Sequence, residues 1–411
     1  MAANDYFVII GAGHAGGVAV QALRGAGHKG PIMLIGDELH LPYERPPLSK
    51  ELLKFGSGVS FRLMRDEAYY EENNVTLKLG VTVLGIEASS QRIFLSDGSN
   101  IPYDKLLLTT GGSVRKVDVP GADLNGVHYL RTIDDSRALE KSLKGGSNLV
   151  VVGGGFIGLE VAASARARGV DVTVLEAAPQ LMGRALPAEI AAVFLNLHEK
   201  NNVTVYLNDG LKAFSGINHV ASVDAMSGKS IPADLVVVGV GIIPETILAK
   251  SACLDIDNGI IVDEFARTSD LNIFAAGDNT NHFNPLLNRH LRLETWQNAQ
   301  NQTVAAAQNM CGGTTIYAET PWVWSDQYDV NLQIAGQPAG WNDLIIRGDF
   351  SGRNFIAFQF SHDKIEAVIA VNRAREMRIA RRLMDANTSV NIDDLVNEKI
   401  SMRDILKSAT S

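Results

Sequence analysis

The sequence has few cysteines, no excess of basic residues and no long uninterrupted apolar run. Its two cysteines, Cys253 and Cys311, lie far apart and outside any CxxC pattern. This excludes a disulfide scaffold and a cysteine-based metal site, and fits a reducing cytoplasm. The net charge of −9 argues against nucleic acid as a main partner, because contacts to a phosphate backbone need an excess of Lys and Arg.

Membrane and export signals are also missing. The longest apolar stretch, residues 149–165, contains four glycines and Glu160, so it is not a membrane span. A strand that starts at Tyr6 leaves no room for a secretory signal in front of it. We therefore expect a soluble cytoplasmic protein that binds neither membrane nor nucleic acid and holds no metal. At 411 residues the chain should contain two or three domains.

A nucleotide-binding pattern opens the chain. An apolar run at residues 7–10 leads into glycines with G-x-G-x-x-G spacing, which are Gly11, Gly13 and Gly16. A helix rich in small residues follows at 15–24, and a second apolar run at 32–35 leads to Asp37. Such glycines let the backbone approach a pyrophosphate at a helix N-terminus, and the acid is placed to bind ribose hydroxyls. The glycines alone would also fit a structural turn, but the flanking strand, helix and acid favour a dinucleotide site.

The same pattern occurs a second time between residues 148 and 178. Its glycines are Gly153, Gly155 and Gly158, and Glu176 takes the place of Asp37. Two independent patterns of this kind predict two bound dinucleotides. Glu176 favours NADH over NADPH, because a carboxylate at about 4 Å would repel a 2′-phosphate by up to about 4 kcal/mol.

The remaining segments have weaker signals. Three prolines argue against a regular element just before Ser49, which we expect to cap a helix that begins at Lys50. From Trp322 onward, alternating apolar and polar residues predict an antiparallel sheet with one wet face. Two helices are predicted at the end, at residues 375–384 and 392–407.

Several motifs together resemble a known family. The two glycine patterns, LLLTTGG, GVGIIPE and IFAAGD are similar to the FAD-dependent pyridine nucleotide-disulfide oxidoreductases. PYERPPLSK, YLRTIDD, GGGFIGLEVAA and PWVWSDQY resemble, within that superfamily, the ferredoxin reductases of bacterial Rieske dioxygenase and cytochrome P450 systems. The resemblance implies an α/β fold with two Rossmann-like, glutathione-reductase-like domains and a C-terminal α+β domain. The implied domains are an FAD-binding domain at 1–115 and 247–320, an NADH-binding domain at 116–246 and a C-terminal domain at 321–411.

The resemblance also implies binding residues. Those expected at FAD are Gly11, Gly13, Ala15, Gly16, Asp37, Lys50, Val83, Arg131, Asp278 and Trp296. Those expected at NADH are Gly153, Gly155, Phe156, Ile157, Gly158, Glu176 and Gly241. From the residues alone, a solvated helix position for Lys50 and a surface ion pair for Arg131 are favoured, and only the resemblance points to FAD.

A catalytic pair is implied by the same resemblance. Lys50 and Glu160 are expected to pair beside the flavin N5 and to orient the nicotinamide. Taken alone, Glu160 also fits an acid that favours a helix N-terminus. Phe156 fits either a gate over the flavin or a core residue.

The implied function is an oxidoreductase of aromatic hydrocarbon catabolism. It would pass electrons from NADH through FAD to an acidic [2Fe-2S] ferredoxin in a transient complex, and so indirectly to a terminal oxygenase. Disulfide chemistry is disfavoured, since Tyr43 occupies the loop in which thiol-dependent relatives carry a cysteine. The residues expected to dock the ferredoxin are Trp324, Arg373, Arg375, Arg378 and Arg382, although the arginines also fit a solvated helix face. The alternatives are an NADH oxidase, a rubredoxin reductase, or a flavin-bearing interaction protein like apoptosis-inducing factor.

Overall fold

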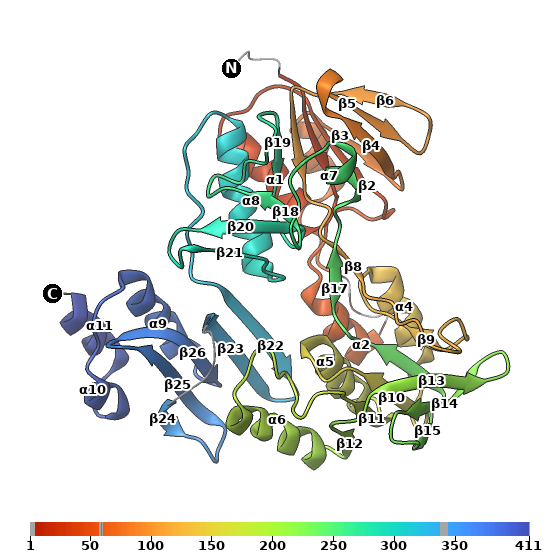
Figure 1. Ribbon diagram of the computed structural model, residues 1–411, viewed down its shortest axis with the longest axis vertical. Coiled ribbons are helices and arrows are strands. Elements are labelled where there is room, and N and C mark those ends of the chain that lie inside the picture. Colours follow the sequence, from red (N-terminus) through yellow and green to blue (C-terminus); the bar gives the residue numbers. More distant parts are fainter. Residues whose placement is uncertain (1–4, 57–58, 60, 338–343, 411) are drawn as a thin grey trace. The chain divides into compact units, whose positions relative to one another are not determined.

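The computed structural model describes residues 5–56, 59, 61–337 and 344–410, which divide into two compact units (Figure 1). The first unit contains residues 1–44, 61–113 and 242–321, and the second contains 45–60, 114–241 and 322–411. Residues 45–60 thus belong to the second unit, whereas the sequence-based division keeps them with the FAD-binding part. The assignment of ligands to domains by residue range stays a prediction.

The first unit is built on a parallel sheet with the strand order β19-β7-β1-β2-β3. Its strands are β1 (Phe7–Ile10), β2 (Ile32–Gly36), β3 (Val75–Leu79), β7 (Lys105–Leu108) and β19 (Ile273–Ala275). Val8 and Ile10 of β1 pack into one hydrophobic core, and Phe7 and Ile9 pack into another on the opposite face. Because both faces are covered, the strand is a continuous apolar run with no alternation.

Helices and two smaller sheets complete the first unit. The helices are α1 (His14–Gly25), α3 (Glu67–Glu72), α7 (Ile247–Ser251) and α8 (Trp296–Met310), of which α1 and α8 pack against each other. One smaller sheet contains β4 (Val83–Glu87), β5 (Arg92–Leu95) and β6 (Asn100–Pro102), and a short η3 (Ala88–Ser90) joins its first two strands. The other contains β18 (Ile260–Val262), β20 (Thr280–Asn284) and β21 (Arg289–Leu291). The short strands β8 (Gly112–Val114) and β17 (Ile242–Pro244) pair with each other.

The second unit contains a parallel sheet of the same design, with the order β12-β11-β10-β16-β9. Its strands are β9 (Val127–His128), β10 (Asn148–Val152), β11 (Asp171–Leu175), β12 (Val203–Tyr206) and β16 (Leu235–Val238). The accompanying helices are η1 (Pro46–Ser49), α2 (Glu51–Phe55), α4 (Ile133–Ser142), α5 (Phe156–Arg166) and α6 (Ala188–Lys200). A small antiparallel sheet is formed by β13 (Leu211–Gly216), β14 (Val220–Ala225) and β15 (Ser230–Pro232).

The C-terminal part of the second unit is an antiparallel sheet with the order β22-β23-β26-β25-β24, followed by three helices. The strands are β22 (Trp322–Gln327), β23 (Val330–Gly336), β24 (Ile345–Asp349), β25 (Asn354–Ser361) and β26 (Lys364–Val371), and the helices are α9 (Ala374–Ala386), α10 (Ile392–Val396) and α11 (Met402–Thr410). The predicted wet face is wrong for the central strands. Phe355 and Ala357 of β25 enter one core, while Ile356 and Phe358 enter a second core closed by Met377 of α9 and its neighbours.

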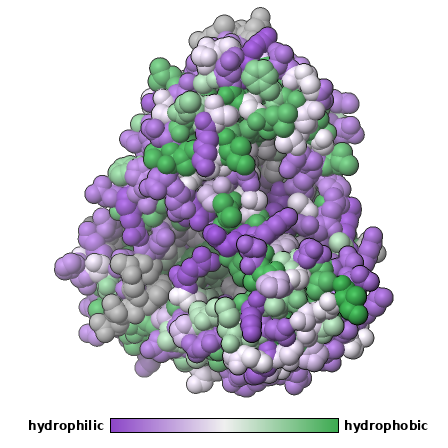
Figure 2. All heavy atoms as spheres, turned by 45° about the vertical axis from the view of Figure 1, so that its right-hand side comes forward, coloured by the Kyte–Doolittle hydropathy of each residue, from purple (hydrophilic) through white to green (hydrophobic). Residues whose placement is uncertain are grey.

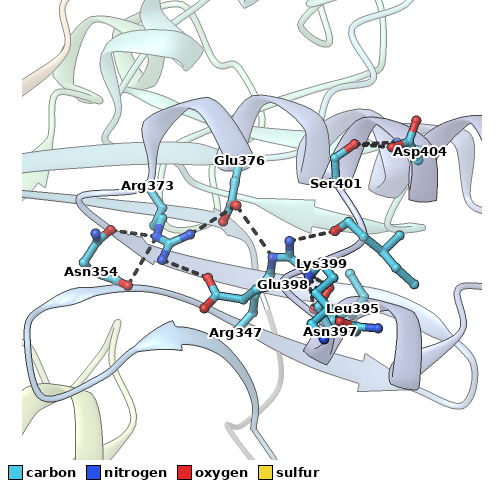
Figure 3. Close-up of polar contacts among 11 residues, drawn as sticks. Arg347, Asn354, Arg373, Glu376, Leu395, Asn397, Glu398, Lys399, Ser401 and Asp404 are labelled. Carbon is cyan, nitrogen blue, oxygen red and sulfur yellow. Dashed lines mark hydrogen bonds and ion pairs between the residues drawn. The ribbon is translucent and has the colours of Figure 1, made fainter.

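The last predicted helix is in fact two helices. Arg347 is only 3% exposed. Its guanidinium donates hydrogen bonds to the carbonyl oxygens of Leu395, Asn397 and Ile400 (Figure 3). A continuous helix would use such carbonyls in its own i to i+4 bonds. The buried guanidinium instead holds the chain between α10 and α11 in a non-helical form.

The expected cap at Ser49 is also wrong. Pro46 to Ser49 form a 3-10 turn, which suits proline because its fixed φ is close to the 3-10 value. Lys50 occupies the N-cap of α2, and the Ser49 hydroxyl bonds to Glu160 instead.

Within the described ranges, no helix has both the length and the apolar character to cross a membrane, and no cluster of three or more His, Cys, Asp or Glu residues could hold a metal. On the face drawn in Figure 2, hydrophilic residues are spread widely and hydrophobic residues form separate patches between them.

Candidate functional site

The first glycine turn tolerates no side chain at two positions. A Cβ on Gly11, whose φ is +109°, would lie 2.3 Å from the carbonyl oxygen of Thr109. A Cβ on Gly16 would lie 2.0 Å from the carbonyl oxygen of Gly11. Strand β1 and helix α1 therefore approach each other closely, and α1 begins with no side-chain cap at Gly13. Such a helix start presents backbone N–H groups and a partial positive charge, which suits a pyrophosphate.

A cavity of about 360 Å³ lies beside this turn, at the carboxyl ends of β1 and β2. Its lining includes Gly11, Asp37 and Val83, which were all predicted at FAD, and also Thr110 and Glu245. Asp37 is exposed, so its carboxylate is accessible to ribose hydroxyls. Thr110 and Glu245 were not predicted, although both lie in motifs that carry the resemblance, LLLTTGG and GVGIIPE.

The remaining predicted FAD residues of the first unit lie around the starts of α1 and α8. Asp278 follows β19 and Gly277, and a Cβ on Gly277 would lie 3.5 Å from the Cβ of Ala15. Trp296 is the first residue of α8, and its ring lies 5.0 Å from that of His14 on α1. The Oδ1 atom of Asn279 is fully buried and accepts no hydrogen bond from any described residue. The tight glycine turn, the adjacent cavity and this spare acceptor fit a bound dinucleotide.

The second glycine turn reproduces the first. Gly153 has a φ of +107°, and its Cβ would lie 2.5 Å from the Gly239 carbonyl oxygen. A Cβ on Gly158 would lie 2.1 Å from the Gly153 carbonyl oxygen, whereas a Cβ on Gly155 would meet no atom within 4 Å. The open space at Gly155 lies where the pattern brings backbone close to a pyrophosphate.

Glu176 is held against this turn. Its carboxylate accepts hydrogen bonds from the backbone N–H of Gly154 at 2.6 Å and of Ala178 at 2.7 Å. Arg184 was not predicted, yet its guanidinium would lie 3.8 Å from a Cβ on Gly241. No motif surrounds Arg184, so only the folded chain reveals its position.

Phe156 and Ile157, the first two residues of α5, differ in exposure. Phe156 packs partly buried against the core of the second unit, and Ile157 is 47% exposed. The roles predicted for both at NADH stay predictions.

The Lys50–Glu160 ion pair is present, with 3.0 Å between Nζ and Oε2. Glu160 is 3% exposed and accepts two further hydrogen bonds, from the hydroxyls of Ser49 at 2.5 Å and Ser325 at 2.7 Å. The loop that carries Lys50 is held in place by Ser164, whose hydroxyl donates to the Ser49 carbonyl. Neither serine partner of Glu160 was predicted: the resemblance implied only the pair with Lys50, and each serine lies more than 100 residues from Glu160 in the sequence.

Arg131 lies in the second unit with Lys50, just before helix α4. Its backbone N–H donates to the carboxylate of Asp135, and its carbonyl oxygen accepts a hydrogen bond from Arg45 at 2.5 Å. The other predicted FAD residues belong to the first unit. The FAD roles of Lys50 and Arg131 therefore stay predictions.

The predicted docking residues fall into two groups. Arg375, Arg378 and Arg382 are exposed and recur every three or four residues, so they share one side of α9. Arg373 is bound to neighbouring side chains, which are Asn354, Glu376 and Glu398 (Figure 3).

The ring of Trp324 stacks on that of Trp322 at 5.1 Å, and Arg381 of α9 lies over the Trp322 ring at 5.2 Å. The basic helix α9 and the Trp322–Trp324 pair are thus neighbours within the C-terminal part.

Comparison with known families agrees with this geometry. Residues 6–303 match the model described as pyridine nucleotide-disulphide oxidoreductase, which is more than half of the chain. The chain belongs to this family. Residues 322–406 match a second model, described as reductase C-terminal. The predicted fold class and superfamily are confirmed, and membership implies FAD and NAD(H) as the bound cofactors.

Individual relatives of this pyridine nucleotide-disulphide oxidoreductase cover nearly its whole length. It is 43% identical to the ferredoxin–NAD(+) reductase component of the anthranilate 1,2-dioxygenase system of Burkholderia cepacia, over 98% of this chain and 99% of the relative. It is 42% identical to rhodocoxin reductase of Rhodococcus erythropolis, over 92% of this chain and 88% of the relative. The crystal structure of the covalent putidaredoxin reductase–putidaredoxin complex matches with a TM-score of 0.96 at 34% identity, over 99% of each chain.

Proposed function

We propose that this chain is an NADH-dependent ferredoxin reductase, which passes electrons through FAD to a [2Fe-2S] ferredoxin that serves a terminal oxygenase. The observation that carries the proposal is the end-to-end similarity to the ferredoxin–NAD(+) reductase of a dioxygenase system, to rhodocoxin reductase and to putidaredoxin reductase. Two separate dinucleotide-binding turns, one in each unit, are what such a reductase needs. We also place the chain in the cytoplasm, which is consistent with two cysteines that are both free.

The predicted site residues have separate roles in this proposal. Bound FAD would supply the redox chemistry, because a flavin accepts a hydride from a nicotinamide and can release electrons singly. Gly11, Gly16 and Asp37 hold FAD, while Gly153, Gly158 and Glu176 hold NADH. Lys50 and Glu160 align the two rings, and no general acid–base pair is required. The protein contributes positioning and electrostatics.

The ferredoxin docks on the C-terminal part in this proposal. The chain as a whole carries a net charge of −9, so an acidic ferredoxin needs a local basic surface. The exposed arginines of α9, which are Arg375, Arg378 and Arg382, provide one on the same helix whose Arg381 lies over the Trp322 ring. Attraction of this kind speeds association and weakens as salt rises.

One assay separates the proposal from its alternatives. NADH consumption by the FAD-loaded protein is measured with oxygen alone, then with a purified [2Fe-2S] ferredoxin, and then with a rubredoxin. A reductase of the proposed kind is slow with oxygen and accelerates when the ferredoxin is added. Fast turnover with oxygen alone indicates an NADH oxidase, and a preference for the rubredoxin indicates a rubredoxin reductase. Negligible NADH consumption with every acceptor indicates a flavin-bearing interaction protein.

A further inference from the structure

A chain of buried polar side chains runs from Glu160 into the C-terminal part of the second unit. The Glu160 carboxylate on α5 contacts the hydroxyl of Ser325 on β22 at 2.7 Å. The side-chain amide nitrogen of Gln327 lies 3.1 Å from that hydroxyl, and its amide oxygen lies 2.9 Å from Nε2 of His198 on α6. This series of hydrogen-bonded side chains ends at Tyr328, whose hydroxyl lies 3.3 Å from Nδ1 of His198. Ser325, Gln327 and His198 are each 0% exposed.

The direction of each hydrogen bond between Glu160 and Tyr328 follows from the chemistry of the groups that form it. A carboxylate that pairs with Lys50 can only accept, so Ser325 donates its hydroxyl hydrogen to Glu160. The amide nitrogen of Gln327 can only donate, so Ser325 accepts from it. The amide oxygen of Gln327 then accepts from Nε2–H of His198.

The last two groups are compatible with this direction. Burial lowers the pKa of His198, which keeps the ring neutral. Because the Gln327 oxygen accepts from Nε2–H, the single hydrogen lies on Nε2 and Nδ1 is left as an acceptor. Burial also raises the pKa of Tyr328, so its hydroxyl remains a donor to that nitrogen. All four hydrogen bonds therefore point toward Glu160.

We propose that Ser325 is a positioning residue for Glu160, and that Gln327 and His198 fix the direction in which Ser325 donates. Ser325 holds Oε1 of Glu160, which leaves Oε2 turned toward Ser49 and Lys50. If Gln327 did not donate to it, the Ser325 hydroxyl could turn away and Glu160 could change rotamer. The C-terminal part of the protein thus contributes Ser325 to the site that contains the second glycine pattern. The inference rests on the proposed function, in which Glu160 assists reduction of the flavin by NADH.

The test is the rate constant of flavin reduction at saturating NADH, measured anaerobically in a stopped-flow instrument with the FAD-loaded, full-length protein. We expect the flavin of Ser325→Ala to be reduced about tenfold more slowly, because the variant loses one hydrogen bond to a charged carboxylate and with it part of the alignment of Glu160. Asp326→Ala is the matched control, because Asp326 is exposed and is the next residue on the same strand. It should reduce its flavin within about twofold of the parent rate.

A double-mutant cycle distinguishes positioning from a general structural effect. In a Glu160→Ala background, Ser325→Ala should change the rate less than about twofold, because the hydroxyl acts only through the carboxylate. An equal slowing in both backgrounds would overturn the proposal, as would a parent-like rate in Ser325→Ala itself. If Ser325→Ala does not hold FAD, Gln327→Met decides instead: it should slow reduction about threefold, a fraction of the loss expected without the hydroxyl, and a parent-like rate would overturn the proposal. Failure of the proposed function would show differently, as a parent protein whose flavin NADH does not reduce at all.

Discussion

Gly155 and Gly158 of the second dinucleotide turn should respond differently to the same added methyl group. In Gly158→Ala, the new Cβ would lie 2.1 Å from the carbonyl oxygen of Gly153, and this obstacle is backbone that cannot rotate away. The carbonyl would have to move by about 1 Å, and overpacking of this kind costs typically 1–3 kcal/mol. We expect about 3 kcal/mol, because strand β10 and helix α5 are both fixed by the sheet and core around them.

Gly155→Ala adds the same methyl group in open space. No atom lies within 4 Å of the new Cβ, and the φ of −83° is ordinary for alanine. The free energy of unfolding should therefore change by less than about 0.5 kcal/mol. The dinucleotide pyrophosphate should be affected instead, since the backbone can no longer approach it as closely. We expect the dissociation constant for NAD⁺ to rise about tenfold, which corresponds to about 1.4 kcal/mol.

Thermal unfolding and NAD⁺ titration test both variants side by side. The transition of Gly158→Ala should fall by about 6 to 12 °C, since 1 kcal/mol shifts a unit of this size by about 2 to 4 °C. Gly155→Ala should unfold within about 2 °C of the parent and bind NAD⁺ more weakly. Both should keep their FAD, because the first glycine turn lies in the other unit. Equal loss of thermal stability in the two variants, or parent-like NAD⁺ affinity in Gly155→Ala, would refute the reasoning.

Three further predictions concern charge. Glu176→Ala should raise kcat/KM for NADPH relative to NADH by about tenfold or more, since it removes the carboxylate that we propose repels a 2′-phosphate; an unchanged ratio of the two kcat/KM values would contradict this. Burial lowers the pKa of His282 to about 4, so the stability that its neutral ring contributes is complete above about pH 6.5 and is lost as pH falls toward 4. Between pH 7.5 and 5 the parent should lose about 2 kcal/mol more than His282→Phe, measured by urea unfolding, and parallel losses would argue against it. Arg378→Glu and Arg382→Glu should each lower ferredoxin reduction about tenfold at low salt and less at about 0.5 M salt. Flavin reduction by NADH should be unaffected, and Arg403→Glu on α11 should match the parent; an equal effect of Arg403→Glu would rule out a specific docking role.

The segments that were predicted well are those whose structure depends on nearby residues. In each dinucleotide turn, the strand, the glycines, the helix and the acid lie within about 30 residues, as expected for a βαβ unit. Gly11 and Gly153 have φ values of +109° and +107°, and only glycine adopts such values freely. The glycine pattern therefore specifies the backbone geometry of the turn, and both copies adopt that geometry.

The segments that were predicted poorly depend on contacts with distant residues. The C-terminal sheet was expected to have a wet face because its strands alternate, yet α9 to α11 supply apolar residues that cover that face. The final helix was expected to be continuous, and Arg347, about 50 residues earlier, interrupts it through three carbonyl oxygens. Nothing in the local sequence of either segment signals these partners.

The sequence by itself determined the two nucleotide turns and the acids that follow them, because each is a short-range pattern with one steric solution. The family to which the chain belongs was indicated by the resemblance of its motifs. Only the tertiary structure decided how Glu160 is held. Its partners Ser49 and Ser325 lie 111 and 165 residues away in the sequence. A buried carboxylate needs donors for both of its oxygens, and a donor that can come from any part of the chain cannot be located until the chain has folded.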